Sequence, residues 1–416
     1  MQVCARCLYT SDHPLYITFD EEGVCSGCRV HEEKDQLDWN ARSVNLAKIL
    51  HGYRSQTGNN YDCIIPVSGA RDSYFIVHTV KNVFGMNPLL VTYNKQYNTA
   101  VGVRNLANLR IRFNCDIMTM TVNPNTVKKI TRSTLRRFGS MYWHCLAGQT
   151  AYPVQIAVKF KIPLIVWGAH QGVDQVGMFS HLDEVEMTRK YRMEHDLMGF
   201  EAEDLIDDFD DITSVDVMPF RYPDNQELEQ VGVRGIYLNN YLRWDSRAQH
   251  EKMISAYGYE TAPQINTFDT YNDVDCWNYS DVHDYLKWVK HGYGKVLDHS
   301  CREIRLRRMT REQGIALVHK HRFRKPKHLQ LFLDWLGVTE NAFHYIIDQH
   351  RNQNIWERGK NWKWKFRNDR YQVIAKSGDP KQALDLVKSF NEFQLSEPGK
   401  SRDLSDKYIL LGRGFY

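Results

Sequence analysis

One short segment of the chain combines hydroxyl, carboxylate and guanidinium groups in a turn that can bind phosphate. The segment VSGARDS, residues 67–73, follows the apolar run CIIP and opens an amphipathic stretch. Backbone N–H groups at the start of a helix attract anions, Ser68 and Ser73 can donate hydrogen bonds, and Asp72 can hold Mg²⁺. GxxxxGKS/T and GxGxxG are both absent, which excludes a Walker A loop and a dinucleotide fingerprint at this position. The alternative is an ordinary strand–turn–helix connection that Asp72 caps.

Four of the nine cysteines stand in two Cys-x-x-Cys pairs, which 17 residues separate. Each pair can present two thiolates to one ion, and two pairs complete the tetrahedron of a structural zinc site. Because all four ligand positions come from the protein, the pattern favours a structural role over a catalytic one. An iron–sulfur cluster binds the same ligands and is the alternative. The expected ligands are Cys4, Cys7, Cys25 and Cys28, and the intervening LYITFDEEGVC is expected to form a small hairpin that turns at Glu22-Gly23.

These groups need a scaffold, and the sequence from about residue 61 to residue 167 predicts one. Apolar strand-like runs alternate with segments of helical spacing, which predicts a parallel, doubly wound α/β sheet. Ligands of such sheets bind at the carboxyl ends of the strands, near the point where the strand order reverses. The expected strands are Cys63–Val67, Leu89–Tyr93, Ile117–Val122 and Pro163–Trp167, and the expected helices are Asp72–Phe84, Asn98–Phe113, Thr126–Phe138 and Cys145–Phe160.

The strand–helix alternation fades after residue 204, and we expect three regions. They are a four-cysteine zinc ribbon at 1–40, the α/β domain at 41–215 and a mostly helical substrate- or partner-binding region at 216–416. In the last region GVRGIYLNNYLRW is expected to be a strand entering a helix, and TFDTYNDVDCWNYSD a connecting loop. Thr310-x-x-Gln313 predicts a capping box. The charged run HLDEVEMTRKYRMEHD, residues 181–196, has the spacing of a helix with surface ion pairs.

Composition narrows the class of protein. The net charge of +4 on 416 residues is too small to indicate a dedicated nucleic-acid binder. No apolar run reaches the roughly 18 residues of a membrane span, and the N-terminus lacks the core of a secretory signal. We therefore expect a cytoplasmic protein with reduced thiols and no membrane partner. The segment KNWKWKFR has the aromatic and basic residues that can bind single-stranded nucleic acid. However, its alternation of aromatic and basic residues favours a half-exposed strand with extended lysines.

SGARDS resembles the SGGxDS loop of the PP-loop ATP pyrophosphatases. In that family the loop holds the β- and γ-phosphates of ATP, and a substrate oxygen attacks the α-phosphate while pyrophosphate leaves. Two positions depart from the pattern. Ala70 replaces the second glycine, which would cost about 1 kcal/mol if that residue had to adopt positive φ. Arg71 stands at the variable position and can add a contact to phosphate.

Two longer stretches and the cysteine quartet resemble the N-acetyl sugar amidotransferases of the WbpG/PseA type. The stretches begin at MYWHCLAGQTAYPVQ and at YLKWVKHGYGKVLDH, and the likeness runs from Cys4 to about Trp364. It implies that an acetamido group on a nucleotide-linked sugar, expected to be a UDP-diacetamido uronic acid, becomes an acetamidino group through an adenylylated imidate. It also implies ATP and Mg²⁺, a place in surface polysaccharide (LPS O-antigen) biosynthesis, and ammonia from a HisH-like glutaminase with a HisF-like ammonia-channel subunit.

The expected site residues follow from the carboxyl ends of the predicted strands and from the resemblance. The catalytic candidates are Asp72, Ser73, His144, Cys145 and His170. The expected ATP-binding residues are Val67, Ser68, Gly69, Ala70, Arg71, Asp72, Ser73, Tyr93, Asn94 and Gly168. The expected substrate-side residues are Gln171, Asp174, Arg189, Arg192, His291 and His299. The last two belong to a polar cluster that either reaches the sugar or forms an inter-domain contact.

Alternatives stay open at two levels. Cys145 is either a buried core thiol, which we favour because amidine formation needs no thiol, or a nucleophile for sulfur transfer. His170 is either functional or structural. For the whole protein, the alternatives are a PP-loop tRNA-thiolating enzyme that uses Cys145 or the cysteine quartet, and a non-enzymatic subunit in which Ala70 marks a degraded loop.

Overall fold

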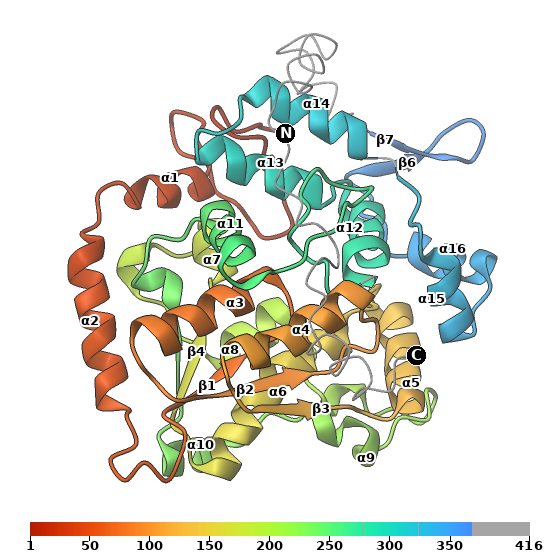
Figure 1. Ribbon diagram of the computed structural model, residues 1–416. Helices are drawn as coiled ribbons and strands as arrows, with labels where there is room; N and C mark the ends of the chain where they lie inside the picture. The colour runs from red at the N-terminus through yellow and green to blue at the C-terminus, as the bar shows by residue number, and fades with distance from the viewer. Residues whose placement is uncertain (277, 323, 368–416) are drawn as a thin grey trace.

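Five parallel strands form the central sheet of the computed structural model, which describes residues 1–276, 278–322 and 324–367 (Figure 1). The strand order is β3-β2-β1-β4-β5, which confirms the expected doubly wound α/β fold. All four predicted strands are present, with ends within two residues of those expected. The strands are β1 Cys63–Pro66, β2 Pro88–Tyr93, β3 Ile117–Met120, β4 Leu164–Trp167 and β5 Arg234–Tyr237.

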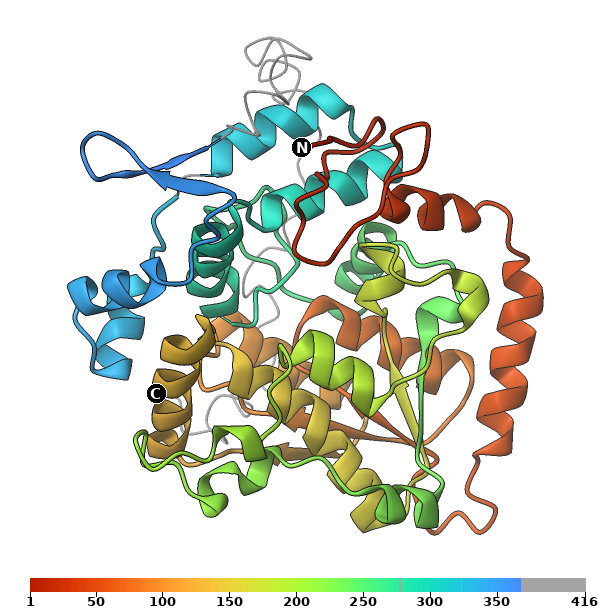
Figure 2. The same ribbon diagram turned by 180° about the vertical axis from the view of Figure 1, so that it is seen from behind.

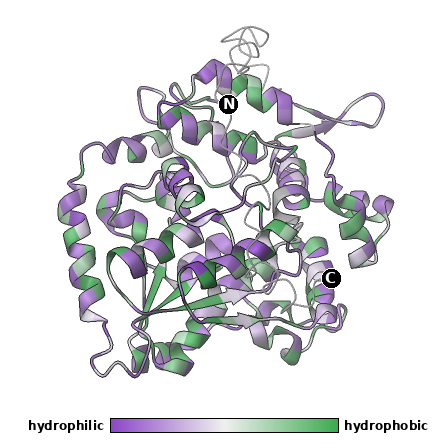
Figure 3. Ribbon diagram, in the orientation of Figure 1, coloured by the Kyte–Doolittle hydropathy of each residue, from purple (hydrophilic) through white to green (hydrophobic). Residues whose placement is uncertain are grey.

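The middle strands are apolar along most of their length because helices cover both faces of the sheet. Every residue of β2 is buried, as are the first three residues of β1 and of β4. Helices α3 (Arg71–Val77) and α4 (Ala100–Arg112) lie on one face and α6 (Trp143–Phe160) on the other, as the two opposite views show (Figures 1 and 2). Strands β1 and β4 are correspondingly hydrophobic in Figure 3.

The helices begin and end where local signals place them. The Thr99 hydroxyl accepts a hydrogen bond from the Gly102 N–H at the start of α4, and Asn123 caps α5. α5 and α11 end at Gly139 and Gly258, both in the left-handed conformation. The helices up to residue 257 are α1 Ser26–Glu33, α2 Trp39–Gly52, α3 with its π-helical continuation η1 His78–Val83, α4, α5 Pro124–Phe138, α6, α7 Gln171–Asp174, α8 Arg189–Tyr191, α9 Ser214–Val217, α10 Asn225–Val231 and α11 Ser246–Tyr257.

The strand order reverses between β1 and β4. From β1 the chain runs through α3 to β2 and through α4 to β3, and then returns through α5 and α6 to β4 on the other side of β1. The segments that leave β1 and β4 therefore start side by side at the carboxyl edge of the sheet. They are residues 67–73, which enter α3, and residues 168–174, which enter α7.

The sheet extends further along the chain than predicted. β5 pairs in parallel with β4, with Tyr237 opposite Trp167, so the α/β domain does not end at residue 215. GVRGIYLNNYLRW does contain a strand that enters a helical turn, at Leu238–Asn240, but the strand belongs to the main sheet. Its partner strand ends more than 60 residues earlier, at Trp167, and no local pattern indicates that pairing.

The charged run at 181–196 is not one helix, which corrects the prediction. It forms a 3₁₀ turn at His181–Asp183, an extended piece, then α8 and a π-helical turn, η3, at Arg192–Asp196. The physical reason is Arg192, whose side chain is buried and paired with Glu201 instead of lying on the surface. Part of the charge in this run is therefore turned toward the protein interior.

The C-terminal region is mostly helical up to residue 367, and residues 368–416 of the predicted region lie outside the described residues. Of the predicted connecting loop TFDTYNDVDCWNYSD, residues 267–276 are irregular as expected, but its last residues belong to a π-helical turn, η7 Asn278–His283, which corrects that part of the prediction. Thr310 and Gln313 form the predicted capping box. β6 Trp356–Arg358 and β7 Trp364–Phe366 pair antiparallel, so KNWKWKFR holds the predicted half-exposed strand. The helices are α12 Asp284–His291, α13 Lys295–Arg305, α14 Arg311–His321, α15 Leu329–Leu336 and α16 Glu340–Asp348.

The N-terminal cysteine segment packs against the C-terminal region. Leu8 and Val24 share one buried cluster with Leu297 of α13 and Leu317 of α14, which lie beside the N-terminus in Figure 1. Within the described ranges, no helix combines the length and the hydrophobicity that crossing a bilayer requires.

Candidate active site and metal centre

The loop at 67–73 has its one left-handed residue at Gly69. Gly69 has φ +82°, and a Cβ added there would lie 2.7 Å from the backbone oxygen of Gly102 and 3.2 Å from Leu106 Cβ. Ala70 has φ −80° and ψ 169°, an extended conformation that any residue adopts. The second glycine of the SGGxDS pattern is therefore not needed here, and Ala70 gives no support to the degraded-loop alternative.

The first turn of α3 is open to an anion. Ala70 is the N-cap and makes no side-chain capping bond, so Asp72 does not cap the helix. The Ser68 N–H donates to Ser73 Oγ at 3.1 Å, and the Ala70 N–H donates to Ser68 Oγ at 3.3 Å. These bonds hold both hydroxyls within the loop. The uncapped N–H groups and the helix dipole favour a negative charge at this position.

Arg71 and Asp72 form the charged side of the loop. Arg71 Nε lies 3.5 Å from Asp72 Oδ1, while Arg71 Nη1 is buried without a hydrogen-bond partner in the described part of the chain. A buried guanidinium N–H without an acceptor is costly, and a phosphate oxygen would satisfy it. Burial raises the pKa of Asp72, and the charge of Arg71 opposes that rise. The pair thus offers a donor to an anion and a carboxylate to a cation.

Residues from three other parts of the chain surround the loop. The guanidinium carbons of Arg71 and Arg302 lie 5.6 and 5.5 Å from the ring centre of Tyr271. Lys34 Nζ binds Asp174 Oδ1 at 2.5 Å, and both line a small cavity with Arg302. Its volume of about 10 Å³ holds about one water molecule. Burial opposes ionisation of Asp174, but the Lys34 ammonium outweighs it and keeps the pKa of that carboxyl below its ordinary value.

Sequence reasoning misses Lys34, Asp269 and Tyr271, which the fold brings toward the loop from distant positions. Asp269 Oδ2 accepts a hydrogen bond from Arg302 Nη2 at 2.8 Å, which orients the guanidinium. The stretch TFDTYNDVDC has no period and so predicts only a connection. Its density of carboxylates and amides beside aromatic residues is the signal that distinguishes it from an ordinary connection.

Three more of the predicted ATP-binding residues lie at the carboxyl edge of the sheet. The Val67 N–H donates to Val91 O at 2.9 Å and the side chain belongs to the core, so only its backbone borders the loop. Gly168 follows β4, and a Cβ there would lie 3.0 Å from Ile76 Cδ1. Asn94 follows β2, and its Nδ2 donates to Thr121 Oγ1 at 3.2 Å. Their predicted contacts with ATP stay predictions.

His144 and Cys145 lie in a buried network at the end of β2. The His144 ring nitrogens Nδ1 and Nε2 pair with the hydroxyls of Tyr93 and Tyr97 at 3.0 and 3.2 Å. Burial lowers the pKa of His144 to about 3 and raises the pKa of the Cys145 thiol, which is fully buried. Tyr93, expected near adenosine, is thus a partner of His144. These residues line neither the cavity beside Lys34 nor the larger one at β4 and β5, and their catalytic role stays a prediction.

A cavity of about 160 Å³ opens at the carboxyl ends of β4 and β5. It brings together His170, Gln171 and Arg192 of the predicted residues. His170 is 2% exposed, and neither of its ring nitrogens has a hydrogen-bond partner within the described residues. Burial lowers the pKa of His170 to about 4. The ring is therefore neutral at physiological pH and offers one donor and one acceptor.

Arg192 is not available to a sugar carboxylate or diphosphate. Its Nε donates to Thr150 Oγ1 at 2.8 Å, its Nη1 to Glu201, and its Nη2 to the Phe220 carbonyl oxygen at 3.3 Å. Arg189 is exposed and lies 3.9 Å from the same Glu201 carboxylate. Both arginines therefore form ion pairs with Glu201 in this structure.

The two predicted histidines of the C-terminal region lie apart from the cavity. His299 Nδ1 is 2.8 Å from Thr267 Oγ1 and 3.7 Å from Asp269 Oδ2, so it lies among the residues that anchor Arg302 near the loop. Burial lowers the pKa of His299 to about 3. His291 ends α12 beside the ring of Tyr293 and lines neither of the two cavities described above.

The cavity also holds groups that the sequence does not single out. Burial raises the pKa of Asp196 to about 7, against the effect of Arg192. Trp167 ends β4 and Tyr237 ends β5, and both line the cavity. The strand-end rule identifies Tyr237 once β5 is placed in the sheet. Trp167 already ends a predicted strand but is not among the predicted site residues.

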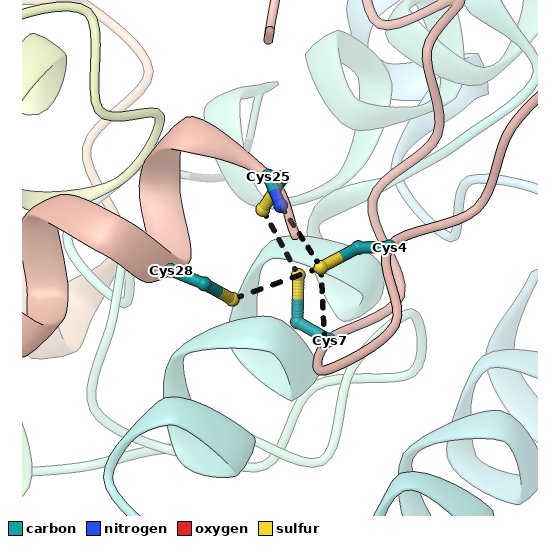
Figure 4. Close-up of side chains that lie close together, drawn as sticks. All are labelled: Cys4, Cys7, Cys25 and Cys28. Atoms are coloured by element: carbon teal, nitrogen blue, oxygen red, sulfur yellow. Dashed lines mark hydrogen bonds between the residues drawn. The ribbon is translucent and has the colours of Figure 1, made fainter. Parts of the chain in front are cut away.

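The four predicted metal ligands are assembled at the N-terminus. Their sulfur atoms lie within 4.8 Å of one another, and the buried side chains point toward a common centre (Figure 4). Two ligands come from the first turn of the chain and two from the start of α1. The predicted turn between them is present, because Phe19 bridges Cys25 and Gly23 has φ +72°. Four converging thiols fit a tetrahedral ion such as Zn²⁺, and equally an iron–sulfur cluster.

An arginine of the C-terminal region lies beside the cysteine quartet. Arg305 Nη2 lies 3.8 and 3.7 Å from the sulfurs of Cys7 and Cys25, and its Nη1 donates to the Gln175 carbonyl oxygen. Four thiolates around one divalent ion carry net negative charge, which a guanidinium offsets. Arg305 lies on α13 one turn after Arg302, so a single helix connects the metal centre to the loop.

Residues 265–369 match the family described as "LPS biosynthesis protein WbpG-like, C-terminal domain". An uncharacterized protein, MJ1599 of Methanocaldococcus jannaschii, is 25% identical over 115 residues, which are 28% of this chain and 41% of that protein. The chain thus spans less than half the length of that curated relative. Among solved structures, NMN synthetase from Francisella tularensis aligns over 55% of this chain and 99% of its own at 12% identity and a TM-score of 0.25.

A TM-score of 0.25 does not establish a shared fold, so the fold assignment rests on the strand order and the loop. The family match covers the segment that holds Asp269, Tyr271 and Arg302. Residues 265–369 therefore resemble a WbpG-like C-terminal domain, and they follow a five-stranded parallel sheet of order β3-β2-β1-β4-β5.

Proposed function

We propose that the protein is an ATP-dependent enzyme that adenylylates the acetamido oxygen of a nucleotide-linked sugar and replaces that oxygen with nitrogen. The observation that carries this proposal is the loop at 67–73, with a left-handed Gly69, an uncapped helix start and a buried Arg71 N–H that lacks an acceptor among the described residues. These features suit the β- and γ-phosphates of ATP. The WbpG-like match of residues 265–369 supports a role in lipopolysaccharide biosynthesis.

The amide of an acetamido group is a poor electrophile, so the reaction needs activation. The acetamido oxygen attacks the α-phosphate of ATP, the bond between the α- and β-phosphates breaks, and pyrophosphate leaves. Ammonia then adds to the imidate carbon, AMP leaves with the former amide oxygen, and an acetamidino group remains. No protein nucleophile takes part, which agrees with the complete burial of Cys145.

The residues around the loop have distinct tasks in this reaction. Arg71 and Arg302 would neutralise charge on the departing pyrophosphate, and Lys34 holds Asp174 in place. Asp72 and Asp174 are the carboxylates that would bind Mg²⁺, whose charge favours pyrophosphate release.

The metal centre and the partners complete the proposal. The cysteine quartet would hold Zn²⁺ as a structural ion that keeps α13 against the rest of the protein. A HisH-like glutaminase with a HisF-like channel subunit would supply ammonia, and a UDP-diacetamido uronic acid would be the acceptor. The identities of the glutaminase, the channel subunit and the acceptor sugar rest on the family resemblance.

Product formation tests the proposal. The protein is incubated with ATP, Mg²⁺, an ammonium salt and a panel of UDP-linked diacetamido sugars, and pyrophosphate and sugar masses are measured. We expect pyrophosphate together with a sugar whose mass has dropped by the exchange of oxygen for NH. Asp72→Ala should abolish pyrophosphate release, and the exposed control Asp208→Ala should not. Intact ATP and unchanged sugars in the wild type would contradict the proposal, and ATP cleavage by Asp72→Ala would contradict the loop assignment.

A further inference from the structure

The cavity at the ends of β4 and β5 lies next to the phosphate loop. Its volume of about 160 Å³ compares with about 10–15 Å³ for one water molecule, so a ligand the size of one sugar ring fits. Helix α7 connects the two places. His170, its N-cap, lines the cavity, and Asp174 at its other end is close enough to Asp72 to raise the pKa of that carboxyl. Helix α7 therefore runs from the cavity toward the loop at 67–73.

Polar atoms without partners mark the cavity as a binding site. Both ring nitrogens of His170 and the indole N–H of Trp167 are buried and have no hydrogen-bond partner in the described part of the chain. Buried polar groups are nearly always paired, so such atoms indicate a ligand or ordered water. Asp196 also lines the cavity. The cavity thus offers N–H donors, one imidazole acceptor and one carboxyl group.

The charged side chains that line the cavity favour a neutral ligand. Arg192 is the only arginine or lysine among the described residues that line the cavity, and its three nitrogens already donate to other groups. A phosphate or carboxylate in the cavity would have no counter-ion and would lie close to Asp196. The diphosphate of the acceptor, and the carboxylate of a uronic acid, must therefore lie outside it.

The rest of the wall is mostly aromatic and apolar. Tyr191, Tyr222 and Tyr237 line the cavity together with Met187 and Ala169. Aromatic faces pack against the C–H faces of sugar rings, and small apolar side chains accommodate the methyl of an acetyl group. A nucleobase would also pack against such walls. However, the nucleobase of the acceptor takes no part in the reaction, whereas the acetamido group does. Asp196 in the cavity wall is a carboxyl group that can take part, so the acetamido sugar is the better occupant.

We propose that this cavity receives the acetamido sugar ring of the acceptor and that Asp196 accepts the proton that the ammonia nitrogen loses when it joins the imidate carbon. The inference rests on the proposed function. In this step the ammonia lone pair forms the C–N bond, and one N–H proton passes to the Asp196 carboxylate. The C–O bond then breaks with both electrons leaving on AMP, and Asp196 releases the proton to solvent. His170 and Trp167 hold the sugar through its hydroxyl and amide groups.

The surroundings of Asp196 suit this role. The charged and titratable groups that face it are Arg192 on its own turn, Tyr191 of α8 and Tyr237 of β5, with His170 in the same cavity wall. Burial raises the pKa of Asp196 to about 7, and Arg192 opposes the rise. A carboxylate with this pKa accepts a proton at neutral pH more readily than an exposed one.

Blocking the mouth of the cavity tests occupancy. Gln171 is exposed and lines the cavity, so Gln171→Trp should fill the entrance, while Lys190→Trp adds the same bulk at an exposed position outside the lining. The probe is a UDP-linked diacetamidoglucose in saturation-transfer NMR. Its acetyl methyl protons should receive the strongest transfer in the wild type and in Lys190→Trp, and lose most of it in Gln171→Trp. Strongest transfer to the uracil protons, or none to the methyl protons in the wild type, would overturn the assignment.

Separating the two halves of the reaction tests Asp196. Asp196→Asn should still release pyrophosphate but form about 100-fold less amidine per pyrophosphate, the contribution typical of a general base. Glu194→Gln removes an exposed carboxylate on the same turn and should behave as the wild type. At constant free ammonia, the wild-type amidine yield should rise through a pH of about 7, and that of Asp196→Asn should stay flat. A wild-type yield from Asp196→Asn would overturn the proton transfer.

Failure of this inference is distinguishable from failure of the proposed function. If no sugar yields an amidine in the wild type, the proposed function fails, and the NMR transfer still decides whether the cavity binds acetamido sugars. If the wild type forms amidine and both Gln171→Trp and Asp196→Asn do so equally well, the cavity assignment alone fails. Gln171→Trp alters an exposed side chain, so it decides occupancy even if Asp196→Asn does not fold.

Discussion

A Cβ atom on Gly69 would lie 2.7 Å from the backbone oxygen of Gly102, so the loop at 67–73 rests directly on helix α4. Gly102 is equally confined on its other side, since a Cβ there would lie 2.4 Å from Asp275 Cα. The loop, α4 and the start of the segment that matches the WbpG-like family therefore stack through two glycines. The shape of the loop depends on both contacts.

Gly69→Ala is expected to destabilise the protein and to weaken ATP binding. Alanine at φ +82° costs about 1–2 kcal/mol, and the contact with Gly102 adds to this. Chemical unfolding and calorimetric titration with ATP and Mg²⁺ measure the two effects. Ala70→Gly is the matched control, because its extended backbone does not require glycine, and it should bind ATP like the wild type. Equal ATP affinity in Gly69→Ala would contradict the importance of this contact.

Arg71→Gln is expected to weaken ATP binding by roughly 10- to 100-fold, as the loss of a charged hydrogen bond of about 1.5–3 kcal/mol implies. The reason is Arg71 Nη1, which is buried and has no acceptor among the described residues. Affinity for adenosine, which lacks phosphates, should not change, and the exposed Arg112→Gln should match the wild type. Unchanged ATP affinity in Arg71→Gln would mean that phosphate lies elsewhere.

The order of strands and helices could be predicted because each element carries its own local signal. β1 and β4 are short apolar runs buried on both faces, and the loop that follows β1 is a small-residue turn. The cysteine quartet was equally local, since two pairs with a short spacer bring their own ligands together.

The rest of the site depends on packing that no local pattern contains. Tyr271 and Arg302 reach the loop from about 200 residues further along the chain, and Lys34 reaches it from the other direction. Tyr237 belongs to the cavity only because β5 joins the sheet beside β4. The resemblance predicted substrate-side residues but not the walls of the cavity at β4 and β5, since those come from strand ends and an irregular segment.

The cysteine quartet should bind about one metal ion per chain. Elemental analysis is expected to find zinc without visible absorption, whereas iron with visible absorption would assign an iron–sulfur cluster. Cys7→Ser should lose the ion and lower the melting temperature, and ATP affinity should fall as well, because Arg305 and Arg302 share α13. Cys115→Ser, a thiol outside the quartet, is the control. Full metal content in Cys7→Ser would contradict the site.

Cys145→Ala should retain amidine formation. The thiol is fully buried and burial raises its pKa, which makes it a poor nucleophile. Lost packing should cost about 1 kcal/mol of stability. Pyrophosphate and amidine are measured with and without added tRNA. Loss of activity in a folded variant, or stimulation of the wild type by tRNA, would favour the tRNA-thiolation alternative.

Asp196 should make the stability of the ligand-free protein fall as pH rises, unlike a carboxylate with a cationic partner. Burial raises the pKa of Asp196 from 3.8 to about 7 on folding, so the folded protein binds more protons than the unfolded chain between these values. Stability is then lost over that window and stays lower above it. Asp196→Asn removes the buried charge and should therefore raise the melting temperature at about pH 8, with little change at about pH 4. Glu194→Gln, whose carboxylate is exposed, should show no such difference between the two conditions. A melting temperature for Asp196→Asn that is lowered at the higher pH would show that the ionised carboxylate is stabilised by a partner in the folded protein.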